Sequence, residues 1–381
     1  MAAQPLVLET LRDEAAWAAL EPEWRALYAI APGAAPPLRW EWQWLWWQVY
    51  GPVYGHGAQP LRIVCARLDG RLVGVLPLYL SRPRRTLGMP VLRPLSSGEE
   101  EFEETCAEYL GALIAPDMEA PVTAALSAHL HQQREFVLLD LPAVAGDALV
   151  SGLRDWWVRT ESLGPCWQAD LSNGVEPYLA TLSRTTRQKA RKFLRESFEP
   201  GYRFDLARTR DEALAIFEDL AALHQERWTA AGKAGCFAAP RFLDFHRRLV
   251  AALAAPGEVA LARLIEDGRP ISVHYGFPCR RVLQCYQTGA VLDGSTRLKS
   301  PGIAGWLRLA EELRPLGIDQ LDYLLGANDF KQRMAVKGPE LWRVRAARPG
   351  ARTGLLRFAD HLREKRRPSA PKAEEEPADE A

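Results

Sequence analysis

The stretch DGSTRLKSPGIAGWLRLAEELRPLGIDQLDYLLGANDFK, residues 293–331, guides the interpretation of the whole chain. A polar loop leads through Ser300, Pro301 and Gly302 into a predicted amphipathic helix, and an apolar strand ending at Gly326 follows. Free N–H groups and the helix dipole both attract an anion at such a helix start. The stretch therefore predicts a cradle for the pyrophosphate of a nucleotide-bearing cofactor, although Ser300-Pro301-Gly302 is also typical of an ordinary helix start.

The composition is that of a globular protein without a dominant charge. The chain has 381 residues, of which 48% are hydrophobic, and its 48 basic and 48 acidic side chains balance. No global field recruits nucleic acid, and no apolar run reaches the roughly 20 residues that span a membrane. We expect no specific nucleic acid partner, no membrane insertion and a cytoplasmic location. The six cysteines form no CxxC pair, so we expect neither a metal site nor a disulfide scaffold.

A short internal repeat indicates two similar domains in tandem. Residues 66–75 read ARLDGRLVGV, and residues 262–273 read ARL, two further residues and DGRPISV. Both segments predict a strand, a tight Asp-Gly turn and a second strand. The mixture of antiparallel strands and helices predicts an α+β fold. Equivalent halves place the boundaries at 1–172 and 173–365, and the Pro, Ala, Lys and Glu composition of 366–381 predicts a disordered tail.

The corresponding loop of the first half differs in charge from the loop at Ser300. If both halves share a fold, it lies between Pro94 and Glu104, a segment with five glutamates. Carboxylates repel a phosphate, and this repulsion would cancel a helix-dipole gain of only about 0.3 to 1 kcal/mol. Cofactor binding is therefore expected in the second half alone.

Three further patterns allow both a structural and a functional interpretation. Trp40 to Trp47 holds five tryptophans, which suit packing better than a sugar-stacking platform. His129 and His131 are two apart on a predicted helix and point in different directions, a poor arrangement for a metal. One stripe of a predicted helix is either a solvated face or a wall for an anionic substrate: Arg184, Arg187, Arg191 and Arg195.

The chain resembles the GNAT acyltransferases of the CelD type, most clearly in its second half; these proteins accompany bacterial cellulose and exopolysaccharide biosynthesis and are related in fold to the FemAB transferases. The resemblance covers about Pro5 to Ala335 and is carried by RLKSPG at 297–302, the helix after it, LDYLLG at 321–326 and Phe330-Lys331. It implies two tandem GNAT-like domains, each a mainly antiparallel mixed sheet flanked by helices. It also implies acetyl-CoA or another acyl-CoA as co-substrate.

The resemblance assigns the pyrophosphate and other cofactor contacts to one set of residues: Arg297, Lys299, Ser300, Gly302, Ile303 and Lys331. Ser300 stands where the family signature usually has its first glycine, and Phe330 stands where the family usually has a tyrosine beside the lysine. Because phenylalanine has no proton to give, Tyr323 or Tyr286 would have to supply a phenol.

The implied reaction is acyl transfer to an amine of a small molecule or amino sugar. It needs a base for the substrate ammonium and a proton for the departing thiolate. His274, Asp322 and His224 are candidate bases, and Tyr286 is a candidate acid. The candidate catalytic residues are therefore His274, Tyr286 and Asp322, and the candidate substrate-binding residues are Arg187, Arg191, His224 and Trp228.

Two other functions remain open at this stage. One is FemAB-like aminoacyl transfer from charged tRNA to a peptide precursor, for which only the stripe from Arg184 to Arg195 offers a basic face. The other is a non-catalytic scaffold that keeps the GNAT fold. The sequence does not identify the acceptor, the acyl chain length, the catalytic acid and base, the oligomeric state or whether the protein is active.

Overall fold

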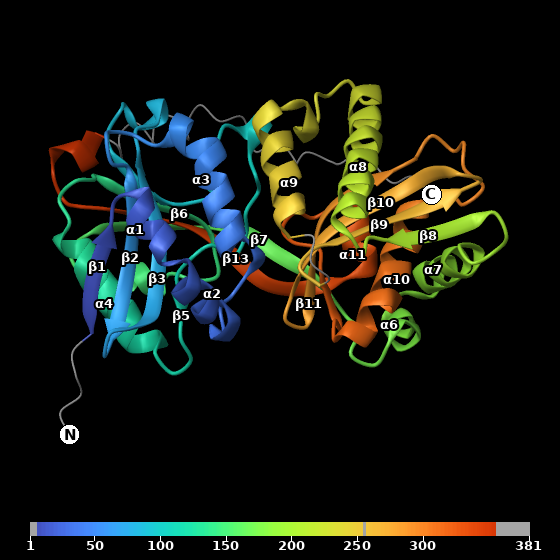
Figure 1. The fold of residues 1–381 in the computed structure, drawn as a ribbon, viewed down its shortest axis with the longest axis horizontal. Helices are drawn as coiled ribbons and strands as arrows, with labels where there is room; N and C mark the ends of the chain where they lie inside the picture. Colours follow the sequence, from blue (N-terminus) through green and yellow to red (C-terminus); the bar gives the residue numbers. More distant parts are fainter. Residues whose placement is uncertain (1–5, 254–256, 356–381) are drawn as a thin grey trace. The chain divides into compact units, whose positions relative to one another are not determined.

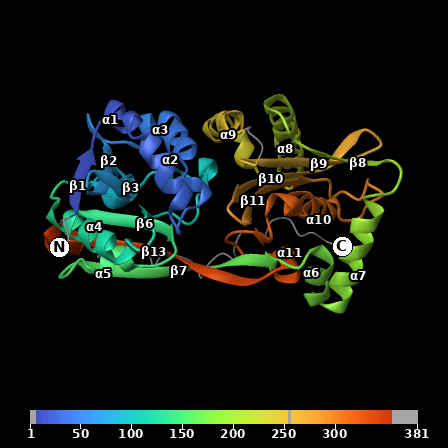
Figure 2. The same ribbon diagram turned by 60° about the horizontal axis from the view of Figure 1, so that its bottom comes forward.

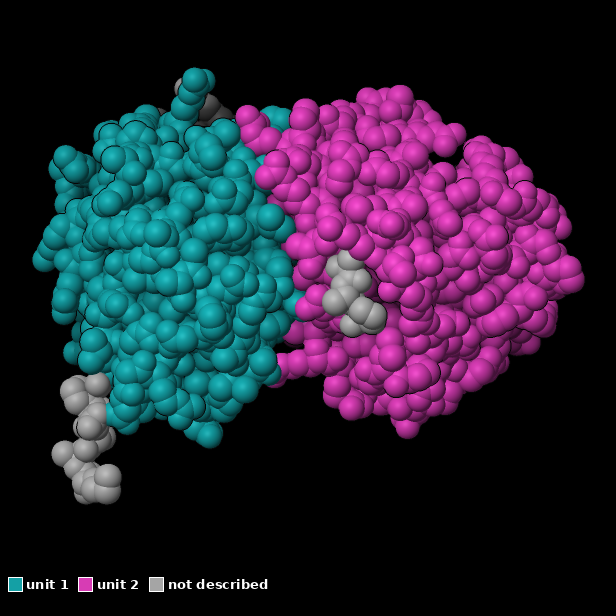
Figure 3. Space-filling view, in the orientation of Figure 1, with its two compact units in different colours: residues 1–164, 340–371 teal, residues 165–339, 372–381 magenta. Residues whose placement is uncertain are grey.

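The computed structural model describes residues 6–253 and 257–355 (Figure 1). Within these residues the chain forms two compact units, 6–164 with 340–355 and 165–339 (Figure 3). The expected domains were 1–172 and 173–365. The units differ from them mainly at the C-terminal end, because residues after 339 pair with strands of the first unit. The expected tail at 366–381 lies outside the described residues.

The first unit is a mixed sheet with strand order β1-β2-β3-β4-β6-β13, in which β5 also pairs with β3. Neighbouring strands are antiparallel except for β4 and β6, which are parallel. Its strands are β1 (Val7–Leu11), β2 (Leu61–Leu68), β3 (Arg71–Ser81), β4 (Val91–Pro94), β5 (Leu113–Ile114), β6 (Leu138–Val144) and β13 (Val336–Ala347). Its helices are α1 (Glu14–Ala19), α2 (Glu21–Ile30), α3 (Trp40–Tyr54), α4 (Glu119–Gln132) and α5 (Ala148–Ser151).

The second unit is a mixed sheet with strand order β8-β9-β10-β11-β12-β7. Here β11 and β12 are the parallel pair, and the other neighbours are antiparallel. Its strands are β7 (Trp157–Asp170), β8 (Tyr202–Leu206), β9 (Ala260–Glu266), β10 (Arg269–Cys279), β11 (Val282–Ala290) and β12 (Gln320–Asp322). Its helices are α6 (Val175–Thr181), α7 (Arg184–Glu196), α8 (Arg210–Ala230), α9 (Pro240–Ala252), α10 (Pro301–Leu313) and α11 (Asp329–Met334).

The two units repeat one topology. Each runs from an edge strand through helices into three consecutive antiparallel strands, then through a helix into a strand parallel to the third. The hairpin that suggested the repeat occupies the same place in both units. Its turns are Asp69-Gly70 and Asp267-Gly268, and all four residues have positive φ, as the favoured two-residue hairpin turn requires. The repeat therefore predicted a real duplication, and each unit has the expected α+β architecture.

Each sheet ends in a strand from an unexpected part of the chain. After β6, the chain enters β7, whose residues 168–170 pair with β12 in the second unit. After α11 it enters β13, whose residues 342–347 pair with β6 in the first unit. Each of these two strands thus pairs with a strand remote from it in sequence, which no local pattern in the sequence could predict.

In the second unit, α8 and α9 lie on one side of the sheet and α10 lies on the other (Figure 2). Side chains of β10 alternate between these two helical layers. Tyr275 contacts Phe217 of α8 and His246 of α9, with ring centroids 6.0 and 5.7 Å away. Its neighbour His274 contacts Trp306 of α10 at 4.6 Å. Helices α8 and α9 therefore cover one face of this sheet, and α10 covers the other.

In the first unit, the tryptophan-rich segment forms α3 and packs into the core. Trp42 and Trp46 are 1% and 0% exposed, and Trp46 packs on Tyr79 of β3 with ring centroids 5.4 Å apart. The packing interpretation of this segment is confirmed, because rings this deeply buried offer no platform to a sugar.

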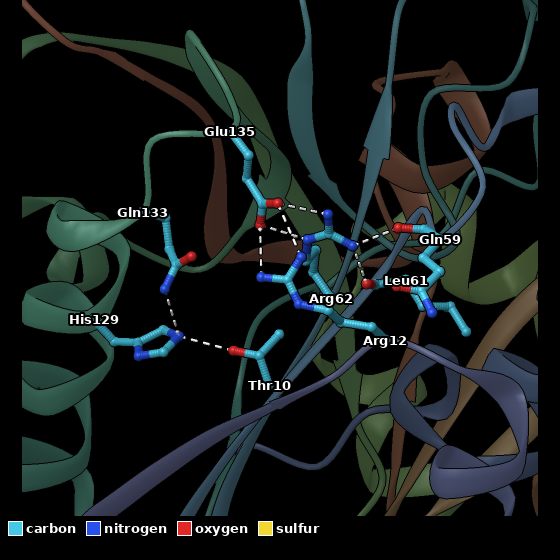
Figure 4. Close-up of polar contacts among 8 residues, drawn as sticks. All are labelled: Thr10, Arg12, Gln59, Leu61, Arg62, His129, Gln133 and Glu135. Carbon is cyan, nitrogen blue, oxygen red and sulfur yellow. Dashed lines mark hydrogen bonds and ion pairs between the residues drawn. The ribbon is translucent and has the colours of Figure 1, made fainter.

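The first unit also accounts for His129, the first histidine of the HxH pair (Figure 4). Its Nε2 lies 2.8 Å from Oγ1 of Thr10 and 3.1 Å from Nε2 of Gln133. Beside it, Glu135 accepts hydrogen bonds from Arg62 and Arg12. These contacts tie α4 and the segment after it to β1 and β2, so the imidazole has a structural role.

Candidate functional site

The parallel strands β11 and β12 pair over only three residues. Their register runs from Val282 opposite Gln320 to Gln284 opposite Asp322. Beyond Gln284, β11 continues to Ala290 paired with β10 but no longer with β12. Beyond Asp322 the chain stays with β7 instead, since the N–H of Tyr323 donates to the carbonyl of Trp167 at 2.7 Å. The two strands therefore separate in the middle of the sheet and leave one edge of β11 without a neighbouring strand.

A bulge lies on β11 at the start of this separation. Opposite Tyr275 and Gly276 of β10 stand Gln287 and Cys285, so Tyr286 is an extra residue in the ladder. A bulge re-aims side chains and is frequent beside active sites. Here it places Tyr286 and Gln287 on the same face as α8 and α9, whereas Thr288 bonds Trp306 on the face of α10.

The N-terminus of α10 lies beside the far end of β11. A Cβ built on Gly302 would lie 3.8 Å from Cβ of Ala290 and 4.0 Å from Cγ2 of Thr288. No side chain caps this helix. The N–H groups of Gly302 and Ile303 fall in its first turn, where helical geometry provides no acceptor. Ser300, Gly302 and Ile303 are thus brought together at the open edge of β11, in an arrangement that suits a bound anion.

The structure places Arg297 and Lys299 differently. The guanidinium of Arg297 pairs with Asp267 at 3.0 Å and with Glu266 at 3.4 Å, and it lies over the ring of Tyr202. These contacts hold Arg297 at the β9–β10 hairpin. Lys299 is exposed on the loop before Ser300. Of these two cations, only Lys299 has no carboxylate beside it in the described structure.

Asp322 and Lys331 stabilise the turn that follows β12. Asp322 is 2% exposed and accepts hydrogen bonds from Gln168 at 3.0 Å and from the N–H of Leu324 at 2.8 Å. The ammonium of Lys331 donates to the carbonyls of Leu324 and Leu325. Both residues fix the backbone where β12 leaves β11, and this role does not support Asp322 as a base.

Tyr323 lies next to the phenylalanine that replaces the family tyrosine. Its ring packs edge-on against Phe330 with centroids 5.3 Å apart, and it also contacts Trp306 of α10 at 6.2 Å. Burial raises the pKa of Tyr323 well above its usual value, so the phenol keeps its proton at neutral pH. The residue that follows β12 therefore places a protonated phenol beside Phe330.

His274 is a core residue, which corrects its candidacy as the general base. It is 0% exposed, and its Nε2 lies 3.1 Å from Oγ of Ser272. A Cβ built on Gly305 of α10 would overlap the imidazole, so helix and ring are in close contact. Burial lowers the pKa of His274 to about 3. The imidazole is uncharged at neutral pH and is inaccessible to substrate.

His224 and Trp228 lie on the opposite face, at the end of α8. The two rings stack with centroids 5.6 Å apart, and Nε2 of His224 lies 3.7 Å from Sγ of Cys236. Gln287 of β11 donates to the same sulfur at 3.9 Å. Burial lowers the pKa of His224 to about 4 and raises that of Cys236 to about 12, so both are neutral at pH 7.

Tyr286 belongs to the same face and reaches a histidine that the sequence analysis missed. Its hydroxyl lies 2.9 Å from Nε2 of His246, whose Nδ1 lies 3.2 Å from the hydroxyl of Tyr275. Burial lowers the pKa of His246 to about 3. His246 occupies a helix position that resembles ordinary core, and nothing in the sequence indicates it, because the bulge at Tyr286 is known only from the structure.

The arginine stripe lies apart from His224 and Trp228. Helix α7 packs against α10, on the other side of the sheet from α8. Arg191 pairs with Glu176 at 2.7 Å, and Arg187 donates to the carbonyls of Ala180 and Leu182. The expected grouping of Arg187 and Arg191 with His224 and Trp228 in one substrate site is therefore wrong.

A polar cavity of about 430 Å³ opens elsewhere in the second unit, between β8, β9 and the start of α8. Its Arg263 is neutralised by Asp205 and Asp219 at 3.0 and 2.6 Å, and its Arg208 lies 3.7 Å from Glu312. Because these charges are paired within the protein, the cavity has no net preference for a charged ligand, and it contains none of the residues predicted from the sequence.

Across 6–253 and 257–355, no group of three or more His, Cys, Asp and Glu side chains is placed to hold a metal ion. In the same ranges, no helix is long and apolar enough to cross a bilayer.

Comparison with known proteins identifies the fold of the second unit. Residues 183–332 match a family model described as an acetyltransferase (GNAT) domain. No curated protein sequence matches the chain. Among solved structures, that of FemX is similar, with 12% identity, a TM-score of 0.58 and coverage of 88% of this chain and 96% of that one.

A second similar structure is a conserved protein of unknown function from Bacteroides thetaiotaomicron VPI-5482. It has 12% identity and a TM-score of 0.52, and the match covers 90% of this chain and 100% of that one. At such identities the likeness shows the fold alone. Residues 183–332 are therefore similar to a GNAT acetyltransferase domain, within an α+β fold that resembles these two structures over most of the chain.

Proposed function

We propose that the protein is an acyl-CoA-dependent N-acyltransferase whose acyl-CoA site lies in the second unit. The separation of β11 from β12 after Gln284 and Asp322, next to the uncapped start of α10, carries this proposal. In this proposal an extended acyl-pantetheine chain lies along the free edge of β11. The first turn of α10, at Gly302 and Ile303, is suited to hold the pyrophosphate. Acetyl-CoA is the donor that the resemblance to GNAT proteins favours.

The equivalent place in the first unit is filled by the protein itself. There β4 and β6 are parallel over two residue pairs, and the loop after β4 occupies the space where they separate, because the N–H of Leu110 donates to the carbonyl of Ala143 at 3.0 Å. The acidic residues belong to this loop: Glu99 accepts hydrogen bonds from Trp46 and Thr105, and burial raises its pKa to about 6. This supports a single acyl-CoA site per chain.

The proposed reaction forms an amide and breaks a thioester. The acceptor amine attacks the carbonyl carbon, the C–S bond breaks, the amine nitrogen loses a proton and the thiolate of CoA gains one. The free edge of β11 presents backbone N–H groups to which a thioester carbonyl could bond.

Two substitutions at Gly302 test the site. Because a Cβ there meets only ordinary contacts, Gly302→Ala should fold and bind acetyl-CoA as the wild type does. Gly302→Glu places a carboxylate at the helix start, where it should weaken acetyl-CoA binding at least tenfold by calorimetry. Equal affinity of the two variants for acetyl-CoA would reject the placement of the pyrophosphate, and no binding to the wild type would reject the proposed function.

The acceptor in this proposal is an amine of a small molecule or sugar, and the resemblance to CelD-type proteins suggests a link to exopolysaccharide synthesis. A second candidate function is aminoacyl transfer from charged tRNA, favoured by the exposed basic residues of α7, among them Arg184, Lys189 and Arg195. Binding of tRNA to α7 should weaken steeply with salt. Salt-insensitive or absent tRNA binding would reject this candidate.

A further inference from the structure

The end of α8 concentrates buried polar atoms that lack hydrogen-bond partners. They belong to residues within a single helical turn: Nδ1 of His224, Oε1 of Gln225, Nε of Arg227 and Nε1 of Trp228. Buried polar groups in folded proteins are nearly always hydrogen-bonded. His224 is only 2% exposed, so its unpartnered nitrogen is deep in the structure. Such a cluster indicates a place where a ligand completes the hydrogen bonding.

Arg227 gives this cluster a charge. It is half-buried, and no carboxylate lies within ion-pair distance of it among residues 6–253 and 257–355. Other arginines of this unit are neutralised; for example, Arg247 pairs with Glu218 at 2.7 Å and Arg263 pairs with Asp219 at 2.6 Å. An unpaired, partly desolvated guanidinium is a strong site for an anion.

The guanidinium is held in place by aromatic stacking. Its Cζ lies 5.8 Å from the ring centroid of Trp228, and Trp228 in turn stacks on His224 at 5.6 Å and 28°. The ammonium of Lys233 lies 5.2 Å from the same ring. Two cations thus flank an indole whose own N–H is unpartnered. Both the guanidinium and the indole can only donate hydrogen bonds, so a ligand with acceptor oxygens complements them.

This cluster adjoins the strand that borders the proposed acyl-CoA site. A Cβ built on Gly289 of β11 would lie 3.0 Å from Leu223 and 3.3 Å from the nitrogen of His224. Gln287 of β11 contacts Cys236, which also contacts His224. The cluster therefore begins against β11, on the face opposite α10, from which an acceptor could approach a thioester.

We propose that the acceptor amine carries an anionic group, a carboxylate or a phosphate, which binds Arg227 with the indole N–H of Trp228. The proposal rests on the proposed acyltransferase function and specifies its substrate class. Arg227 binds and orients the acceptor; it takes no part in the chemistry at the thioester. This substrate class differs from a neutral sugar amine, whose hydroxyl groups would leave the guanidinium without a counter-charge.

The test compares matched acceptors and matched variants. Thiol release from acetyl-CoA is measured with L-alanine against L-alaninamide, and with glucosamine 6-phosphate against glucosamine. The variants are Arg227→Gln, Arg227→Lys and the control Arg210→Gln, an exposed arginine at the start of the same helix. In a pair of amines that the enzyme acetylates, the anionic amine should have a KM at least tenfold lower than the neutral amine. Arg227→Gln should abolish that difference, Arg227→Lys should keep part of it, and Arg210→Gln should keep it all.

The pair that responds distinguishes a carboxylate from a phosphate. Equal use of neutral and anionic members, or an equal effect of Arg227→Gln on both, overturns the proposal. If none of the four amines is acetylated, a second measurement tests anion binding directly. The thermal stabilisation of each variant by propionate and by inorganic phosphate is compared at an ionic strength matched with sodium chloride. Stabilisation of the wild type and Arg210→Gln but not of Arg227→Gln supports the proposal, and the same response in all three overturns it. Acetyl-CoA calorimetry on each variant tests the proposed function separately.

Discussion

At the scale of single residues, burial decides which candidate groups can do chemistry. His274 is a histidine on a strand of the central sheet, and the sequence could not show that Gly305 of α10 brings a helix against its ring. Arg227 was missed for the opposite reason. It stands between the candidates His224 and Trp228, but a single arginine in a helix looks like a solvated charge unless its neighbours are known.

The buried histidines predict how stability depends on pH. Burial lowers the pKa values of His224, His246 and His274 to about 4, 3 and 3, from 6.5 in an accessible imidazole. Below pH 6.5 the unfolded chain binds protons that the folded chain does not. The contribution of these uncharged imidazoles to the free energy of unfolding is therefore complete above pH 6.5. It is lost as the pH falls toward the folded-state pKa values, by about 1.4 kcal/mol per pH unit for each imidazole.

Urea unfolding of the second unit between pH 5 and 7.5 measures this loss. Replacing His274 with Gln removes one titrating group and should make the decline of stability with falling pH shallower, even if the variant is less stable at pH 7.5. The control His131→Gln changes an exposed histidine of the first unit and should leave the slope unchanged. Identical slopes in all three proteins would show that His274 titrates normally in the folded state.

At the scale of elements, the sequence predicted α10 well and its packing poorly. Five apolar positions recur at helical spacing in this segment; Trp306, Leu307, Ala310 and Leu313 are buried and Ile303 is partly buried. The start at Ser300 and Pro301 is also confirmed. What the spacing could not show is which glycine of α10 is needed for close contact with the sheet and which is free, because that depends on side chains of β10.

Two glycines of α10 should respond oppositely to the same substitution. At Gly302 a Cβ has room, so Gly302→Ala should leave stability unchanged or raise it by up to about 1 kcal/mol through helix propensity. At Gly305 the new Cβ would overlap the buried ring of His274, so Gly305→Ala should cost about 1 to 3 kcal/mol. Chemical denaturation of both variants checks this, and a stabilised Gly305→Ala would mean that α10 and β10 lie further apart than described.

At the scale of the whole molecule, the sequence predicted the duplication but not the exchange of final strands. The hairpin repeat is local, so it can be recognised from a short stretch of sequence in each half. The pairing of β13 with β6 joins residues about 200 positions apart, and neither strand carries a signal naming its partner. Local patterns therefore lead to two self-contained halves, whereas β13 pairs with β6 and β7 pairs with β12, in each case across a long separation in the chain.

The pairing of β13 predicts that the far C-terminal part of the chain stabilises the N-terminal unit. Val344 is 0% exposed opposite Leu141 of β6, and Arg343 pairs with the buried Asp140 at 2.8 Å. Val344→Ala should lower the stability of the first unit by about 2 kcal/mol. The control Val336→Ala lies on the same strand but is 70% exposed and should change stability by less than about 0.5 kcal/mol.

Hydrogen exchange locates the effect of these two substitutions. In Val344→Ala, amides of β6 should lose protection while those of β10 and β11 keep it, because β13 from Trp342 onward contributes its ladder to the first sheet. A chain ending at residue 339 should show the same pattern more strongly, although every residue of β6 is still present. Loss of protection confined to β10 and β11, with β6 unaffected, would show instead that β13 is dispensable for the first sheet and that the N-terminal unit completes its own core.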